Sequence, residues 1–135
     1  MSTSSGLPPS ITVSSHDMDR LYAMLENPAV GPTPAGQALE AELNRATAVA
    51  PDQMPEGIVM MHSRVECEDE THQAKHVLTL VYPHEANVDE GKVSILAPVG
   101  TALLGLSVGQ SIDWVAPGGG KLRLRVIAVH APTPN

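Results

Sequence analysis

The chain has 135 residues, enough for one domain with a small appendage and for a core that needs no metal or disulfide. Its formal net charge of −7 argues against a surface for nucleic acid or anionic membranes, since both need clustered Lys and Arg. An acidic chain is better suited to a basic partner. Cys67 stands alone, no apolar run could span a bilayer, and the N-terminus lacks the features of a signal peptide. We therefore expect a cytoplasmic protein.

The chain begins with a polar segment and a first helix. Residues 1–13 are rich in Ser, Thr, Gly and Pro, which is typical of a flexible arm. Ser14, followed by Asp17 three residues later, predicts the N-terminus of a helix. The helix carries apolar residues on one face at Met18, Leu21, Tyr22 and Leu25. Asn27 and Pro28 predict its end, because the residue before a proline avoids helical geometry.

A second helix follows a turn at residues 28–36. Thr33 can cap this helix, and Pro34 suits its first position. Its apolar face carries Leu39, Leu43 and Ala46. Because the two apolar stripes can pack together, we expect a short antiparallel helical hairpin over residues 14–50.

The hydrophobic period changes to two after Pro55, which predicts a β domain over residues 56–131. One short helix is expected at 100–105, closed by Gly105. The five expected strands lie at 57–67, 74–82, 93–96, 111–115 and 122–130.

No motif predicts catalysis or a metal site. His72 and His76 straddle a turn and a strand, so their imidazoles need not converge on a metal ion. The carboxylates within 66–70 surround a turn, where a solvated hairpin tip is favoured over a metal or acid–base site. Cys67 lies beside acidic residues, which quiet a thiol. Residues 117–121 lack the spacing of a phosphate loop and predict a hairpin turn.

The segment 96–115 is unusual because its only charged side chain is that of Asp113. Most of its Leu, Val and Ile residues are expected in the core. Pro98 and Gly100 before the short helix, and Gly105 after it, hold the remainder in a defined shape. Such a segment can present a few exposed apolar groups beside backbone donors, which is typical of a docking surface.

The segment 96–114, followed by Pro-Gly-Gly and an alternating strand, resembles the carboxy-terminal domain of the Gre transcript-cleavage factors. Together with MPEGIVMMHSRV, TLVYP and ELNRA, it more closely resembles the bacterial regulators of nucleoside diphosphate kinase, which are short Gre-like proteins. The similarity covers residues 11–131. It implies an α+β fold in which a short antiparallel two-helix hairpin precedes an FKBP-like antiparallel β domain with one short helix.

The resemblance also implies a partner, the core enzyme of RNA polymerase, bound near the rim of its secondary channel. In Gre factors the loop around the short helix contacts this rim. Thr101 stands where the cleavage factors often have Arg, and Gln110 where they often have Asp. Carried over by position, the polymerase-binding residues are Pro98, Val99, Gly100, Thr101, Leu103, Leu104 and Gly105.

The hairpin departs from the cleavage factors, which hold a catalytic magnesium ion with carboxylates at the tip of a long coiled coil. Residues 28–36 contain no Asp or Glu. Helices of about 12 to 15 residues reach only about 18 to 23 Å, and a long coiled coil reaches much further. We therefore expect a non-catalytic transcription regulator, without cofactor or metal, that competes with Gre-type factors.

Three other functions stay open. An FKBP-like prolyl isomerase would need a pocket lined by aromatic residues, and the chain has one Trp, two Tyr and no Phe. An interaction module could instead act on nucleoside diphosphate kinase, although no residue pattern specifies that contact. A plain interaction module with another partner is the third. Direct sequence-specific nucleic-acid binding is not expected, and the oligomeric state is open, a monomer being the expectation.

Overall fold

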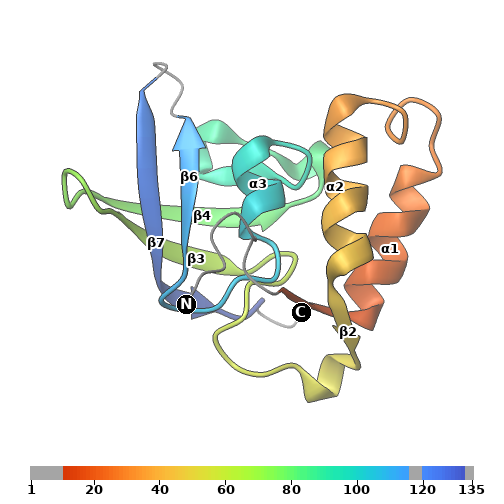
Figure 1. Ribbon diagram of the computed structural model, residues 1–135, viewed down its shortest axis with the longest axis horizontal. Helices are drawn as coiled ribbons and strands as arrows, with labels where there is room; N and C mark the ends of the chain where they lie inside the picture. Colours follow the sequence, from red (N-terminus) through yellow and green to blue (C-terminus); the bar gives the residue numbers. More distant parts are fainter. Residues whose placement is uncertain (1–10, 116–119, 133–135) are drawn as a thin grey trace, which may run out of the picture.

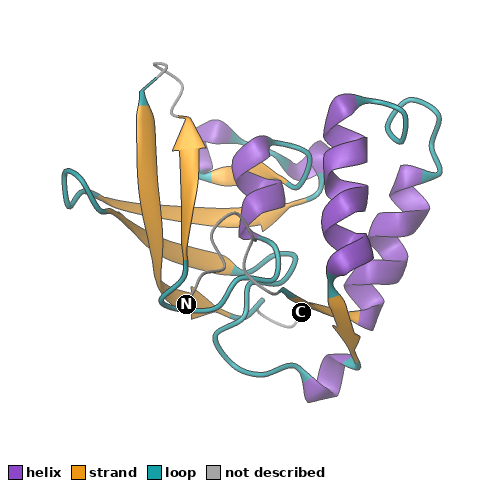
Figure 2. Ribbon diagram, in the orientation of Figure 1, coloured by secondary structure: helices purple, strands orange, loops and turns teal. Residues whose placement is uncertain are grey.

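A computed structural model describes residues 11–115 and 120–132, which form an α+β fold. Two long helices lie side by side at one side of a twisted sheet, and a short helix fills the space between them and the sheet (Figures 1 and 2). The helices are α1 (Ser15–Leu25), α2 (Pro34–Arg45) and α3 (Pro98–Leu103), with single-turn 3-10 helices η1 (Pro51–Gln53), η2 (Pro83–Glu85) and η3 (Val88–Glu90). The strands are β1 (Thr12–Ser14), β2 (Thr47–Val49), β3 (Arg64–Asp69), β4 (Lys75–Val81), β5 (Lys92–Ser94), β6 (Ser111–Val115) and β7 (Lys121–His130).

The helical hairpin begins and turns where the sequence predicts. The Ser14 hydroxyl accepts the Asp17 N–H at 3.0 Å, and the Thr33 hydroxyl accepts the Gly36 N–H at 3.0 Å, so each helix has a side-chain cap. Leu21 of α1 is fully buried. The buried leucines of α2 are Leu39 and Leu43. The predicted apolar faces are therefore the ones that meet the core.

The expected flexible arm is too long at its C-terminal end. Ile11 and Val13 are only 3% and 1% exposed, and β1 pairs in parallel with β2, the strand that follows α2. These two apolar residues belong to the core. The prediction rested on the polar composition of residues 1–13 as a whole, so it did not distinguish Ile11 and Val13 from the polar residues before them. Residues 1–10 lie outside the described part of the chain. The β1–β2 pair joins the start and the end of the hairpin.

The five-stranded sheet has the order β5-β4-β3-β7-β6. Its β4–β3, β3–β7 and β7–β6 pairs are antiparallel, as expected. The β5–β4 pair is parallel, which corrects the expectation of a purely antiparallel domain. The reason is the connection through η2 and η3, which returns the chain along β4 so that Lys92 lies beside Thr79.

Strand β3 is shorter than predicted at its N-terminal end. The segment 57–63 is not a strand but a series of turns that holds His62 at a positive φ of 69°. The Ser63 N–H donates to the Met60 carbonyl, and the Ser63 hydroxyl accepts the Met60 N–H. These local bonds compete with strand pairing, so regular alternation starts only at Arg64.

The hairpin and the sheet share one core. Leu21, Leu39 and Leu43 belong to the same buried cluster as the sheet residues Val65 and Leu80. In Figure 1, α2 runs alongside α3, and α1 lies on the far side of α2 from α3. The hairpin is therefore packed against the sheet domain.

A buried carboxylate ties the start of α1 to the turn before β3. Asp17 is 7% exposed, and its Oδ2 accepts the Met61 N–H at 3.1 Å. Burial raises the pKa of Asp17 above its ordinary value, and the Met61 hydrogen bond opposes part of that shift. In a capping box the Asp17 carboxylate would accept the backbone N–H of Ser14. Here it accepts the Met61 N–H from the turn before β3 instead.

Replacing Asp17 tests this tie. Asp17→Ala leaves the Met61 N–H without its acceptor and is expected to lower the free energy of unfolding by about 1–3 kcal/mol. Asp17→Asn keeps an oxygen acceptor without the buried charge and should stay within about 1 kcal/mol of the parent chain at neutral pH. Urea unfolding of the three chains measures both values. Equal losses in the two variants would contradict the role of the Met61 bond.

The pH dependence of the same variants follows from the raised pKa of Asp17. The folded state binds the proton more tightly than the unfolded state, so this group's contribution to stability falls as pH rises through the folded pKa. The parent chain should therefore gain stability relative to Asp17→Asn as pH is lowered from neutral toward the unfolded pKa. A parallel pair of stability curves would show that the carboxyl is not desolvated.

Candidate functional site

The segment singled out by the sequence surrounds α3. Of its seven expected docking residues, Pro98 is exposed. The other six are buried: Val99, Gly100, Thr101, Leu103, Leu104 and Gly105. In this structure these six residues are not exposed to a partner, and their assignment as polymerase-binding residues stays a prediction. They can support a docking surface only by fixing the shape of the loop that carries Pro98.

Close packing explains the two glycines of this segment. A Cβ on Gly100 would lie 2.0 Å from the Ser94 carbonyl oxygen, so α3 can approach β5 only with glycine there. Gly105 has a φ of +81°, and a Cβ there would lie 2.6 Å from the Ile11 Cβ. Both positions serve the contact of α3 with the rest of the fold.

Thr101 is also explained by internal contacts. Its hydroxyl donates to the Ile95 carbonyl at 2.6 Å, and the residue is 9% exposed. The Thr101 side chain is therefore bonded to the segment just before α3 and lies beneath the surface. The resemblance places this residue where many cleavage factors have Arg. The neighbouring Ala102 is partly exposed.

A groove of about 900 Å³ lies between α2 and the α3–β6 side of the sheet domain. Its walls carry small or rigid side chains, Pro34, Ala35 and Ala38 from α2 and Pro98 and Ala102 from α3. Its apolar floor is formed by Leu96, Leu106 and Ile112. We call these eight residues, with the charged rim described next, the docking groove. Sequence reasoning found its α3 wall and missed its α2 wall, because nothing local to α2 indicates that this face meets α3.

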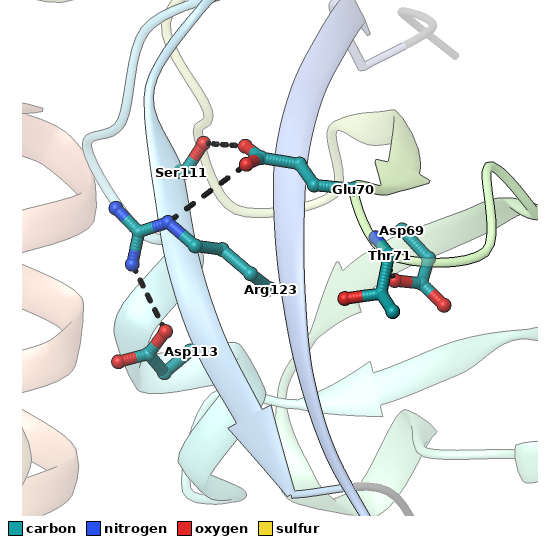
Figure 3. A network of polar contacts seen from close by, with 6 residues as sticks. All are labelled: Asp69, Glu70, Thr71, Ser111, Asp113 and Arg123. Atoms are coloured by element: carbon teal, nitrogen blue, oxygen red, sulfur yellow. Dashed lines mark hydrogen bonds and ion pairs between the residues drawn. The ribbon is translucent and has the colours of Figure 1, made fainter.

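Paired charges form the rim of the docking groove. Arg45 and Glu42 are 2.7 Å apart on α2, and Arg123 and Asp113 are 2.9 Å apart across β7 and β6. Figure 3 shows the Arg123 side chain lying between Asp113 and Glu70. Such exposed pairs contribute little to stability, about 0–1 kcal/mol each, so they remain available to rearrange around a partner.

The acidic turn near 66–70 is more structured than a solvated tip. Asp69 is buried, and its carboxylate accepts the Thr71 N–H at 2.9 Å and contacts the His72 ring at 2.7 Å. The His72 contact lowers the pKa of Asp69. Asp69 therefore clamps the turn. Figure 3 shows it on the other side of β7 from Arg123.

The remaining chemical candidates do not form a reactive site. Burial raises the pKa of the Cys67 thiol to about 11, so at neutral pH it is protonated and a poor nucleophile. Glu66 contacts His130, and Glu68 contacts Arg125. Within 11–115 and 120–132, no three His, Cys, Asp or Glu residues gather as a metal site would require. The predicted turn at 117–121 falls largely on residues 116–119, which lie outside the described residues.

No helix among the described residues has the length and apolar character to cross a membrane.

Comparison with known proteins divides the chain in two. Residues 54–131 match the family described as "Transcription elongation factor, GreA/GreB, C-term", and residues 9–49 match "Rnk N-terminus". The "Regulator of nucleoside diphosphate kinase" of Escherichia coli strain K12 is 42% identical over 122 residues, covering 90% of each chain.

Solved structures agree with this assignment. The structure titled "Prokaryotic transcription elongation factor GreA/GreB from Nitrosomonas europaea" is 45% identical, covers 91% of this chain and 99% of its own, and has a TM-score of 0.78. "GreA factor homolog 1 (Gfh1)" of Thermus thermophilus shares the fold at 24% identity and a TM-score of 0.53, with coverage of 91% of this chain and 100% of its own. The chain belongs to the Gre-like family of regulators of nucleoside diphosphate kinase, in which an Rnk-type N-terminus precedes a GreA/GreB-type C-terminal domain.

Proposed function

We propose that this protein is a non-catalytic transcription regulator that binds core RNA polymerase near the rim of the secondary channel and competes there with Gre-type factors. The observation that carries the proposal is an open apolar groove directly beside the segment that resembles the Gre docking loop. The family membership supports a role in transcription.

The docking groove suits a protein partner. Its walls carry the small side chains of Ala35, Ala38 and Ala102, so a partner can approach the backbone of both helices closely. Pro98 projects at its edge at the first turn of α3, where it has no N–H to leave unsatisfied. The buried part of the loop holds that wall rigidly, which lowers the entropic cost of binding.

The helical hairpin supports the non-catalytic part of the proposal. Helices α1 and α2 have 11 and 12 residues, which corresponds to about 17 to 18 Å. The turn between them is closed by its own backbone bonds, such as Gly31 N–H to the Asn27 carbonyl, and residues 28–36 carry no carboxylate. A hairpin that is short and packed against the sheet lacks both the reach and the ligands to position magnesium in a polymerase active site.

The name of the Escherichia coli relative refers to regulation of nucleoside diphosphate kinase. An effect on that kinase through transcription would give the same name as a direct contact. The docking groove carries no feature that selects a kinase, so we place the direct partner at RNA polymerase. The FKBP-like comparison remains a prediction about the sheet domain, and no described feature favours prolyl isomerisation.

Filling the docking groove with charge should weaken polymerase binding. Ala102→Glu places a carboxylate on the α3 wall, where it must be desolvated on binding, and we expect at least a tenfold rise in the dissociation constant for core RNA polymerase. The measurement is equilibrium binding of the labelled full chain to core enzyme. Because Ala102 is partly exposed, the melting temperature should change little.

The matched control is Val108→Glu. Val108 is an exposed apolar residue that lies outside the docking groove. It should leave both binding and melting temperature unchanged. Equal weakening by the two variants, or no weakening by Ala102→Glu, would place the polymerase contact elsewhere. Leu104→Asp is unsuitable for this test, because Leu104 is buried and the variant is expected to fold poorly.

Transcript cleavage provides the second test. On backtracked elongation complexes with magnesium, the protein should not raise cleavage above the rate of polymerase alone, because residues 28–36 provide no magnesium ligand. A Gre cleavage factor assayed in parallel serves as the positive control. Robust cleavage by this protein would overturn the non-catalytic assignment.

A further inference from the structure

A second groove lies on the other side of the hairpin, between α1 and the η2 turn. Its volume is about 530 Å³, and it shares only Leu96 with the docking groove. We call it the α1 groove. The residues that line it are Arg20, Ala23, Met24, Asn27, Val30, Tyr82, Pro83, His84 and Leu96.

The α1 groove has an uneven charge distribution. The chain has 15 Asp and Glu residues against 8 Lys and Arg, yet no carboxylate lines this groove. Two carboxylates act on Tyr82 from outside the lining, and both are engaged, Glu85 by the His62 ring and the Tyr82 N–H, and Asp17 by the Met61 N–H. The groove thus has a local cationic character in an acidic protein.

Arg20 is placed to receive an oxyanion. Its guanidinium lies 5.1 Å from the centroid of the Tyr82 ring, and no ion pair of Arg20 occurs among the described residues. Arg20 is exposed, and a guanidinium over an aromatic ring can still use its N–H groups for a bidentate contact with a carboxylate. Asn27 uses its side-chain oxygen to accept the Ala29 N–H, so its NH₂ group remains a donor.

The remainder of the groove is apolar. Met24, Val30 and Leu96 are partly buried and lie beside these donors. On α1, residues 20, 23 and 24 share one helix face, and Asn27 lies just beyond the end of the helix at Leu25. This strip runs for about 10 Å, and the exposed Ala23 leaves a gap between its two polar ends. An extended strip of this kind fits a peptide segment better than a compact small molecule.

We propose that the α1 groove binds an acidic segment of a partner protein, with a carboxylate side chain on Arg20 and a neighbouring large apolar side chain against Met24, Val30 and Leu96. The site is separate from the docking groove. It gives the protein a second contact with a partner. That partner segment is acidic, although the net negative charge of the chain favours basic partners.

The experiment is an NMR titration of the isotope-labelled full chain with a terminally blocked octapeptide, Leu-Glu-Glu-Leu-Leu-Glu-Glu-Leu. We expect saturable shifts of the backbone amides of Ala23, Met24 and Asn27. The same peptide with Gln in place of Glu should bind about tenfold more weakly, because it lacks the charge-assisted contact. Arg20→Gln should weaken binding of the Glu peptide by a similar factor.

Arg64→Gln is the matched control, since Arg64 is an exposed arginine on β3 outside both grooves. It should leave peptide binding unchanged. Equal loss in both variants, or shifts that do not saturate or lie elsewhere, would overturn the proposal. Acetate provides a further arm: if acetate alone reproduces the shifts and the peptide binds no more tightly, the groove takes a small carboxylate and not a protein segment.

The same variants separate this proposal from the polymerase proposal. Arg20→Gln should leave core RNA polymerase binding unchanged, because Arg20 lies outside the docking groove. Ala102→Glu should leave peptide binding unchanged, because Ala102 lies outside the α1 groove. Either proposal can therefore fail while the other stands.

Discussion

The seating of the helical hairpin on the sheet domain is the constraint on which the rest of the structure depends. Leucines from both helices enter the common core, and Asp17 joins the start of α1 to Met61 through a buried hydrogen bond. Each groove has one wall on the hairpin and another on the sheet domain. A hairpin that swung away would abolish both grooves, so both proposed binding sites depend on the packing of the hairpin against the sheet.

The segment 98–105, which carries much of the family resemblance, is mostly buried. Gly100 and Gly105 permit close backbone approaches, and Leu103 and Leu104 anchor α3 in the core. In the proposed binding mode their contribution is therefore indirect, because they hold Pro98 at a fixed place. A segment can be diagnostic of a family while few of its side chains are free to touch a partner. This separation of shape from contact also explains why internal residues such as Thr101 can differ from those of the cleavage factors.

Most features that depend on residues close together in the sequence were predicted correctly. Caps at Ser14 and Thr33, the apolar faces of both helices and the alternation of the sheet strands were all confirmed. The irregular segment 57–63 was missed for a local reason, since hydrogen bonds between Ser63 and Met60 replace strand pairing there. The parallel pairing of β5 and the burial of Ile11 were missed, because each depends on residues further along the chain. The same holds for the site. Its α3 wall is visible in the sequence, whereas the α2 wall exists only because the hairpin docks.

The most direct measurement is binding of the full chain to core RNA polymerase, with a Gre factor added as competitor. A shared position at the rim of the secondary channel predicts saturable binding that the Gre factor displaces, with the apparent affinity falling in proportion to competitor occupancy. Simultaneous binding of both proteins, or no binding at micromolar concentration, would contradict it. The family fold would then serve a different partner.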